Sequence, residues 1–169
     1  MSKRKPKKLP IVKVPDTLLR EESKNVVEWT TELRELAEDM LETMYQANGI
    51  GLAAVQVGKP INLIVIDIQF KRRKTQFKHI IMNKSPIVLV NPVIVEEDGV
   101  QYSREGCLSI PKTFGKVQRA KKITVEYKNI DGYDRVMVME DRLAVVAQHE
   151  IEHLTGELFI DRIHPEELE

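Results

Sequence analysis

The segment Gln148-His149-Glu150-Ile151-Glu152-His153-Leu154 constrains the fold of this chain more than any other feature. On an α-helix, residues four positions apart lie on one face, one turn above each other, so His149 and His153 can hold one metal ion between them. Glu150 can then reach a water molecule beside that ion, and the spacing predicts a helix that carries a hydrolytic metal site. The alternative is a chance grouping of polar residues on a solvated helix face. Two features favour the metal site: the chain has only four histidines, and the apolar run 143–147 leads into the segment.

A catalytic site of this type needs a third protein ligand, because three ligands and one open position are the usual arrangement. Cys107, the single cysteine, is the strongest candidate, and Gly106 lets the backbone approach whatever the sulfur binds. His164 is a weaker donor, since Pro165 follows it directly. Two other roles stay open for Cys107. It could be a small buried hydrophobic residue, or a covalent nucleophile, which would leave the histidine pair unexplained.

The segment 49–58, Gly-Ile-Gly-Leu-Ala-Ala-Val-Gln-Val-Gly, is the third notable feature. Its glycines and small residues permit tight turns and the close approach of a ligand, and Gln56 carries an amide donor. Such a segment is also typical of a packing junction. It lacks the Lys-Ser/Thr pair of a phosphate-binding loop.

Together, these segments resemble the peptide deformylase family, which carries Gly-x-Gly-Leu-Ala-Ala-x-Gln, then Glu-Gly-Cys-Leu-Ser, then Gln-His-Glu-x-Asp-His-Leu. The motifs agree in residues, order and spacing, and the resemblance covers most of the chain. It implies hydrolysis of the formyl group from the N-terminal formyl-methionine of newly made proteins, with one divalent metal ion, commonly Fe²⁺. A thiolate with two imidazoles also suits Zn²⁺, Ni²⁺ or Co²⁺. The chain departs from the family at Glu152, where the family has Asp at a position that is not a ligand.

The resemblance also implies roles for individual residues. The metal ligands would be Cys107, His149 and His153, the catalytic acid and base would be Glu150, and the oxyanion site would comprise Gln56 and the backbone N–H of Leu108. The substrate-binding residues would be Ile50, Val145 and Val146 around the methionine side chain, with the backbone of Ile50, Gly51, Glu105 and Gly106 along the peptide. Arg119 would contact the peptide chain, and the alternative for it is an ordinary surface arginine.

Two rival functions share parts of this pattern. A small zincin-like peptidase would use the same helix motif but would leave Cys107 and Gln56 without a role. A non-catalytic, ribosome-associated relative would keep the fold alone, and the complete set of ligands and base argues against it.

Composition indicates one globular domain, residues 11–169, preceded by a basic N-terminal tail, residues 1–10. Apolar residues at 42% and charged residues at 31% are usual for a folded domain of 169 residues. The first ten residues hold five basic and no acidic side chains, which predicts a flexible, solvated tail or, alternatively, contact with ribosomal RNA. A lone cysteine excludes an internal disulfide and favours a reducing compartment such as the cytoplasm. No apolar run approaches the ~18 residues of a membrane span, and no signal-peptide pattern follows the basic start.

Periodicity predicts an α+β fold in a single domain, with antiparallel or mixed sheets around a C-terminal motif helix that bears the metal site. A long N-terminal amphipathic helix is expected over residues 26–48, and the motif helix begins near Asp141. The predicted strands cover 61–68, 87–95 with an interruption at Pro92, and the pair 123–127 and 135–139 around the turn 129–132. The basic run 71–74 is expected to form an exposed loop.

Overall fold

The computed structural model describes residues 4–163 and 165–169, so His164 and the first three residues of the basic N-terminus lie outside the described part. The helices are α1 (Thr31–Gln46) and α2 (Asp141–His153), with 3₁₀ turns η1 (Thr17–Arg20), η2 (Ala54–Val57), η3 (Phe159–Arg162) and η4 (Pro165–Glu167). The strands are β1 (Gly51–Ala53), β2 (Leu63–Ile66), β3 (Lys71–Lys74), β4 (His79–Met82), β5 (Ile87–Asp98), β6 (Gln101–Cys107), β7 (Ile110–Arg119), β8 (Lys122–Lys128) and β9 (Asp134–Glu140).

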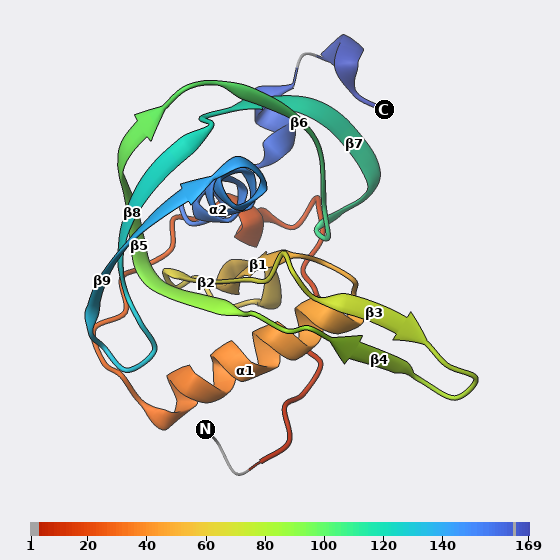
Figure 1. Cartoon of the computed structure of the whole chain (residues 1–169), viewed down its shortest axis with the longest axis vertical. Helices are drawn as coiled ribbons and strands as arrows, with labels where there is room; N and C mark the ends of the chain where they lie inside the picture. The colour runs from red at the N-terminus through yellow and green to blue at the C-terminus, as the bar shows by residue number, and fades with distance from the viewer. Residues whose placement is uncertain (1–3, 164) are drawn as a thin grey trace.

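The main sheet has the strand order β1-β2-β5-β8-β9, and every neighbouring pair is antiparallel. Figure 1 shows this sheet curving around α2, with α1 on its other side. Two further antiparallel ribbons, β3–β4 and β6–β7, stand apart from the sheet. The predicted α+β class, in a single domain with antiparallel sheets, is confirmed.

Strand β2 shows how the core is organised. Its four residues, Leu63–Ile66, are all fully buried, because the sheet is covered on both faces at this point. Ile64 and Ile66 join the cluster around α2, and Leu63 and Val65 join the cluster around α1. An uninterrupted apolar run is therefore what a strand between two helices requires.

Helix α1 is shorter at its start than the apolar spacing predicts. The Thr30 side chain accepts a hydrogen bond from the Leu33 N–H and caps the helix, so Val26 and Trp29 precede it. The Trp29 indole instead donates to the Asn129 carbonyl oxygen in the β8–β9 turn. Among the described residues, no helix is long and apolar enough to cross a membrane.

Two strand predictions need correction. Residues 71–74 form strand β3 and not a loop, although most of their side chains are exposed as expected. Strand β5 is not interrupted at Pro92: it continues to Asp98 through a bulge between Val90 and Val93, where Asn91 adopts a positive φ of 52°. A bulge accommodates a proline that cannot donate to the ladder.

The basic N-terminal segment lies against α1 over the residues that the structure describes. Arg4 forms an ion pair with Asp39 at 2.9 Å, and the Lys7 N–H donates to the same carboxylate. The Leu9 N–H donates to Thr43 Oγ1 at 2.8 Å. Part of the segment expected to be a flexible tail therefore has defined contacts.

Candidate active site

Helix α2 places the three motif side chains in the interior. His149, Glu150 and His153 are 8%, 5% and 1% exposed, which excludes the solvated-face alternative. The two imidazole rings lie 5.2 Å apart between centroids, as expected for neighbours one turn apart. Gln148 holds the helix in position, since its side chain donates to the Ala120 carbonyl and accepts from the Ala120 N–H at the β7–β8 junction.

The β6–β7 ribbon brings the cysteine to this helix. Cys107 is the last residue of β6, and its Sγ lies 3.5 Å from His153 Nε2. One ligand atom each from Cys107, His149 and His153 fall within 4.8 Å of one another. A thiolate and two imidazoles at this spacing fit a transition-metal ion with an open coordination position.

A buried carboxylate orients the first histidine. Glu105 Oε1 lies 2.9 Å from His149 Nδ1, and Arg119 binds both Glu105 oxygens at 2.8 and 2.9 Å. Burial opposes the charge on Glu105, but the hydrogen bonds from Arg119 and His149 outweigh burial and lower its pKa to about 2. An ionised carboxylate can only accept, so Nδ1 carries the hydrogen and Nε2 is left to bind a metal.

His153 is kept neutral in a different way. Burial lowers its pKa well below the ordinary value for histidine. Its Nδ1 is buried, and no described residue forms a hydrogen bond with it. A neutral imidazole is the form that ligates a metal.

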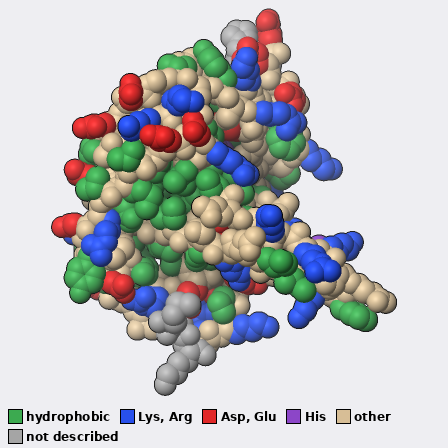
Figure 2. All heavy atoms as spheres, viewed as in Figure 1, with side chains coloured by type: hydrophobic (Ala, Val, Ile, Leu, Met, Phe, Trp, Pro, Cys, Tyr) green, Lys and Arg blue, Asp and Glu red, His purple; other side chains and the backbone are tan. Residues whose placement is uncertain are grey.

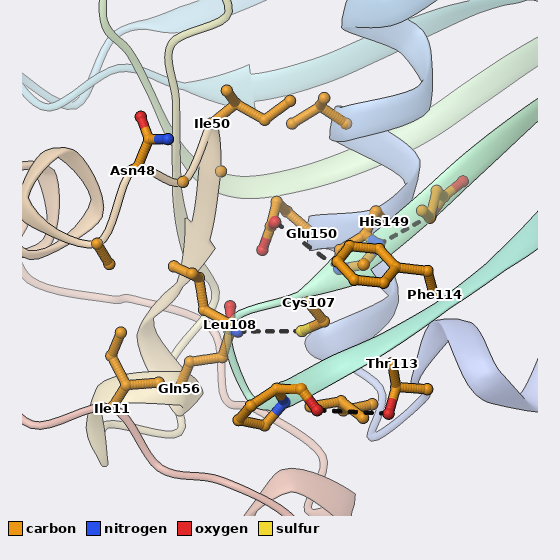
Figure 3. A pocket seen from close by; sticks show the side chains of 18 of the residues that line it. Ile11, Asn48, Ile50, Gln56, Cys107, Leu108, Thr113, Phe114, His149 and Glu150 are labelled. Atoms are coloured by element: carbon orange, nitrogen blue, oxygen red, sulfur yellow. Dashed lines mark hydrogen bonds and ion pairs between the residues drawn. The ribbon is translucent and has the colours of Figure 1, made fainter. Parts of the chain in front are cut away.

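Gln56 lies beside the cysteine with its amide held in a defined orientation. The Ala53 N–H donates to Gln56 Oε1 at 2.9 Å, so the amide nitrogen faces the opposite way. That nitrogen donates to Ser109 Oγ at 3.0 Å and lies 3.5 Å from Cys107 Sγ. Figure 3 shows Gln56, Cys107 and Leu108 converging from η2 and from the turn between β6 and β7.

Glu150 faces the same space from α2. Its Oε1 lies 4.0 Å from His149 Nε2, and its Oε2 is buried without a hydrogen-bond partner among the described residues. Burial raises its pKa to about 7. A carboxyl group of that pKa can both accept and donate a proton near neutrality.

These side chains line a pocket of about 1190 Å³. All the predicted substrate residues except Arg119 are at its wall: Ile50, Gly51, Glu105, Gly106, Val145 and Val146. Gly51 has a clear steric requirement, because a Cβ there would lie 2.7 Å from Glu150 Oε1 and 2.9 Å from Val146. The glycine lets β1 approach the motif helix closely.

Arg119 does not fit either role expected from the sequence. It is 3% exposed, so it is not a surface arginine, and it does not line the pocket. Its guanidinium lies between Glu105 and Glu152, with Nη1 2.7 Å from Glu152 Oε1. Its contacts support His149 through Glu105, from the side away from the pocket.

Glu152, at the position of the family's Asp, belongs to the same network. It contacts Arg119 on β7 and Arg162 in η3. The longer side chain therefore joins the C-terminal segment to the rear of the site.

Sequence reasoning overlooked three contributions to the site. Ser109, fully buried, receives the Gln56 amide hydrogen bond, and its place in the Glu-Gly-Cys-Leu-Ser motif was a usable signal. Phe114 lines the pocket from β7 and Phe159 stacks on the His149 ring at 5.8 Å between centroids. Neither aromatic residue belongs to a recognisable motif.

Comparison with known proteins decides the family. The family model described as polypeptide deformylase matches residues 8–169. This chain belongs to the peptide deformylase family. The peptide deformylase of Bartonella tribocorum is 47% identical over 154 residues, which cover 90% of this chain and 83% of the relative. That of Acidobacterium capsulatum is 47% identical, over 91% of this chain and 85% of the relative.

Solved deformylase structures share the fold. The crystal structure of peptide deformylase from Thermotoga maritima superposes with a TM-score of 0.83 at 37% identity, covering 94% of this chain and 99% of that one. A Met-Ala-Ser-bound peptide deformylase from Acinetobacter baumannii gives a TM-score of 0.80 at 33% identity, over 92% and 98% of the two chains. Peptide deformylases are metal-dependent hydrolases that remove the formyl group from the N-terminal methionine of newly made polypeptides, and this chain is such an enzyme.

Proposed function

We propose that Cys107, His149 and His153 hold the catalytic metal ion and that the native ion is Fe²⁺. The observation that carries this proposal is the convergence of their three donor atoms within 4.8 Å, beside Glu150 and Gln56, in one pocket. The soft thiolate and two imidazoles suit Fe²⁺, and Zn²⁺, Ni²⁺ and Co²⁺ are the alternatives. When bound, the ion activates a water molecule and polarises the formyl carbonyl.

Glu150 is the proton carrier in this mechanism. Its buried carboxylate takes a proton from the attacking water and later gives it to the nitrogen of the leaving amine. Burial supports this role, because a pKa raised to about 7 makes both protonation states accessible at neutral pH. Glu105 and Arg119 hold the neighbouring His149 so that its orientation does not change as the proton moves.

Gln56 and the backbone N–H of Leu108 stabilise the oxyanion that forms on the formyl oxygen. The contact between Ala53 N–H and Gln56 Oε1 fixes the amide before substrate binds, so little reorganisation is needed in the transition state. Ser109 Oγ accepts a hydrogen bond from the Gln56 amide nitrogen in the structure and so helps to fix the orientation of the amide group.

The pocket wall selects the substrate. Ile50, Val145 and Val146 surround the methionine side chain, and the backbone of Ile50, Gly51, Glu105 and Gly106 runs beside an extended peptide. Gly51 brings β1 close to Glu150 and Val146, which narrows the pocket beside the proposed proton carrier. A formyl carbon, which carries only hydrogen there, fits, and the methyl of an acetyl group clashes.

The experiment compares formyl-Met, acetyl-Met and unblocked peptides of one sequence, with metal content measured alongside after anaerobic purification. Wild-type protein should release formate from the formyl peptide alone. Glu150→Gln should keep its metal and lose about 10²–10⁴-fold in kcat. Cys107→Ala should stay folded and lose its metal. Internal peptide cleavage as fast as formate release would favour the zincin-like peptidase, and full metal content in Cys107→Ala would remove that residue from the ligands.

We also propose that the enzyme acts in the cytoplasm or an equivalent reducing compartment. There the Cys107 thiol stays reduced and nascent chains are available.

We further propose that the basic segment 1–10 contacts the ribosome through RNA phosphates. Deleting residues 1–8 should leave the hydrolysis of short peptides intact and weaken ribosome binding in a salt-dependent way. Unchanged ribosome binding would leave the segment without this role.

A further inference from the structure

The hairpin β3–β4, residues 71–84, is one of two strongly basic segments of the chain, with the N-terminal one, and none of its residues lines the pocket. It holds six cationic side chains, Lys71, Arg72, Arg73, Lys74, Lys78 and Lys84, and no acidic residue. Because the whole chain is neutral, the remainder has a net charge of −6. Figure 1 shows the hairpin projecting from the body beside α1, and Figure 2 shows blue side chains gathered over that projection.

The base of the hairpin is held firmly by one buried carboxylate. Asp67, 1% exposed, accepts hydrogen bonds from the N–H groups of Gln69 and Phe70 before β3 and of Ser85 after β4. It also accepts from the Tyr45 hydroxyl, whose pKa is raised by burial and by Asp67, so the hydroxyl stays a donor. The Asp67 carboxylate is thus engaged in the core, and the ribbon leaves the body from a fixed point.

The strand register spreads the positive charge over both faces of the ribbon. Lys71 and Arg73 pair with Met82 and Ile80 on one face, and Lys74 pairs with His79 on the other. Within the described parts of the chain, none of the side chains of Lys71, Arg73, Lys74 and Lys78 forms an ion pair. Unpaired like charges at neighbouring positions repel each other, and a polyanion laid along the ribbon would remove that repulsion.

The turn at the far end presents an aromatic ring. Phe77 is 89% exposed, more than any other large hydrophobic side chain among the described residues. The turn beneath it is ordered by two hydrogen bonds from Thr75, N–H and hydroxyl, to the Lys78 carbonyl oxygen, both 2.8 Å. An exposed aromatic ring beside cations is the combination that stacks on an unpaired base while the phosphates are neutralised.

We propose that this hairpin is an RNA-binding element: its lysines and arginines contact phosphates, and Phe77 stacks on an unpaired base. A membrane surface fits less well, because the cations of β3 lie on both faces of the ribbon and leave neither face uncharged to enter the apolar layer. Action on nascent polypeptides places the enzyme close to ribosomal RNA. The RNA contact itself does not depend on the ligand and base roles proposed above.

The test measures binding of the metal-loaded, full-length enzyme to a fluorescein-labelled RNA stem-loop by anisotropy over a range of salt concentrations. The triple variant Arg73→Gln/Lys74→Gln/Lys78→Gln should weaken binding at low salt at least about tenfold and reduce the slope of log Kd against log salt by about 2. Phe77→Ala should weaken binding about tenfold with the salt slope unchanged, and should have no effect on a fully paired RNA duplex.

A matched control removes three exposed lysines elsewhere, Lys24→Gln/Lys59→Gln/Lys122→Gln, with the same change in net charge. This variant should bind RNA like wild type, and both triple variants should hydrolyse short formyl-Met peptides at the wild-type rate. Equal weakening by the two triples would show a non-specific effect of net charge and overturn the proposal. Hairpin-dependent binding to phosphatidylserine-containing vesicles, without binding to the stem-loop, would also overturn it in favour of a membrane contact.

Discussion

The ribbons β3–β4 and β6–β7 are both two-stranded and antiparallel, yet their surroundings differ completely. Ribbon β6–β7 curves along α2 and packs through Val117 against Phe159 and Leu19. Ribbon β3–β4 is anchored by the hydrogen bonds of Asp67 at its base and by Ile81 against the cluster around α1, and its far end projects into solvent. Strand pairing alone is therefore enough to form a two-stranded ribbon. Such a ribbon contributes residues to the active site only where one of its faces packs against a helix, as β6–β7 does against α2.

The inward face of β6–β7 is unusual because it carries a buried ion pair. Its buried positions include Glu105 on β6 and Gly115, Val117 and Arg119 on β7, while Tyr102 is exposed and Phe114 is partly exposed at the pocket wall. Glu105 and Arg119 are tolerated there because each neutralises the other and both support the helix that carries His149. A buried charge with its partner in place is stable, and the same charge alone is costly.

The largest effect on stability should come from breaking this buried pair. Arg119→Leu leaves Glu105 and Glu152 buried without their shared cation, so the free energy of unfolding should fall by about 3–5 kcal/mol. Urea unfolding followed by circular dichroism measures the change. The control is Arg104→Leu on the outer face of β6, whose exposed ion pair with Glu169 should contribute no more than about 1 kcal/mol. Equal losses in the two variants would mean that burial of the network is not the decisive factor.

A smaller effect is expected from crowding the ribbon. A Cβ at Gly106 would lie 2.7 Å from the Phe114 ring, so Gly106→Ala should displace that ring and destabilise the protein by about 1 kcal/mol. KM for a formyl-Met peptide should rise with it, since both residues line the pocket. Adding Phe114→Leu should recover the stability. A double variant less stable than Gly106→Ala would show that the ring is not the group that must move.

The smallest effect should come from the projecting ribbon. Replacing residues 73–80 by a short turn removes exposed side chains and leaves Asp67 and its hydrogen bonds in place, so stability should change by no more than about 0.5 kcal/mol. Hydrolysis of short formyl-Met peptides should be unchanged. Thermal unfolding and a formate assay test both points, and a large loss of stability would mean that β3–β4 contributes to the core.

The candidate site was largely predictable where its residues are close in sequence. The spacing of His149, Glu150 and His153 specifies their relative placement once a helix forms, because a helix repeats every 3.6 residues. The turn 129–132 similarly predicts the hairpin β8–β9, since Asn129 accepts hydrogen bonds from the Asp131 and Tyr133 N–H groups within the turn itself. Local geometry decides both features, and the local sequence is enough to read them.

The β6–β7 ribbon was not predictable in the same way. Alternation of apolar and polar residues is the usual strand signal. Here Glu105, Gly115 and Arg119 are buried, while the apolar Phe114 is partly exposed at the pocket wall. Strand β3 was mistaken for a loop for a related reason: a run of four cations has no apolar face to reveal its period.

The sequence by itself determined the helix motif, the donor types and the family, because these depend on residue identity and short spacing. Only the tertiary structure decided that Arg119 is buried behind the pocket and that Glu152 reaches Arg162. It also decided that the basic run 71–74 pairs with β4 in a projecting ribbon. Each of these depends on contacts between residues distant in the chain. Charge and polarity are the same in the sequence whether a side chain faces solvent, substrate or a buried partner, and only packing distinguishes the three.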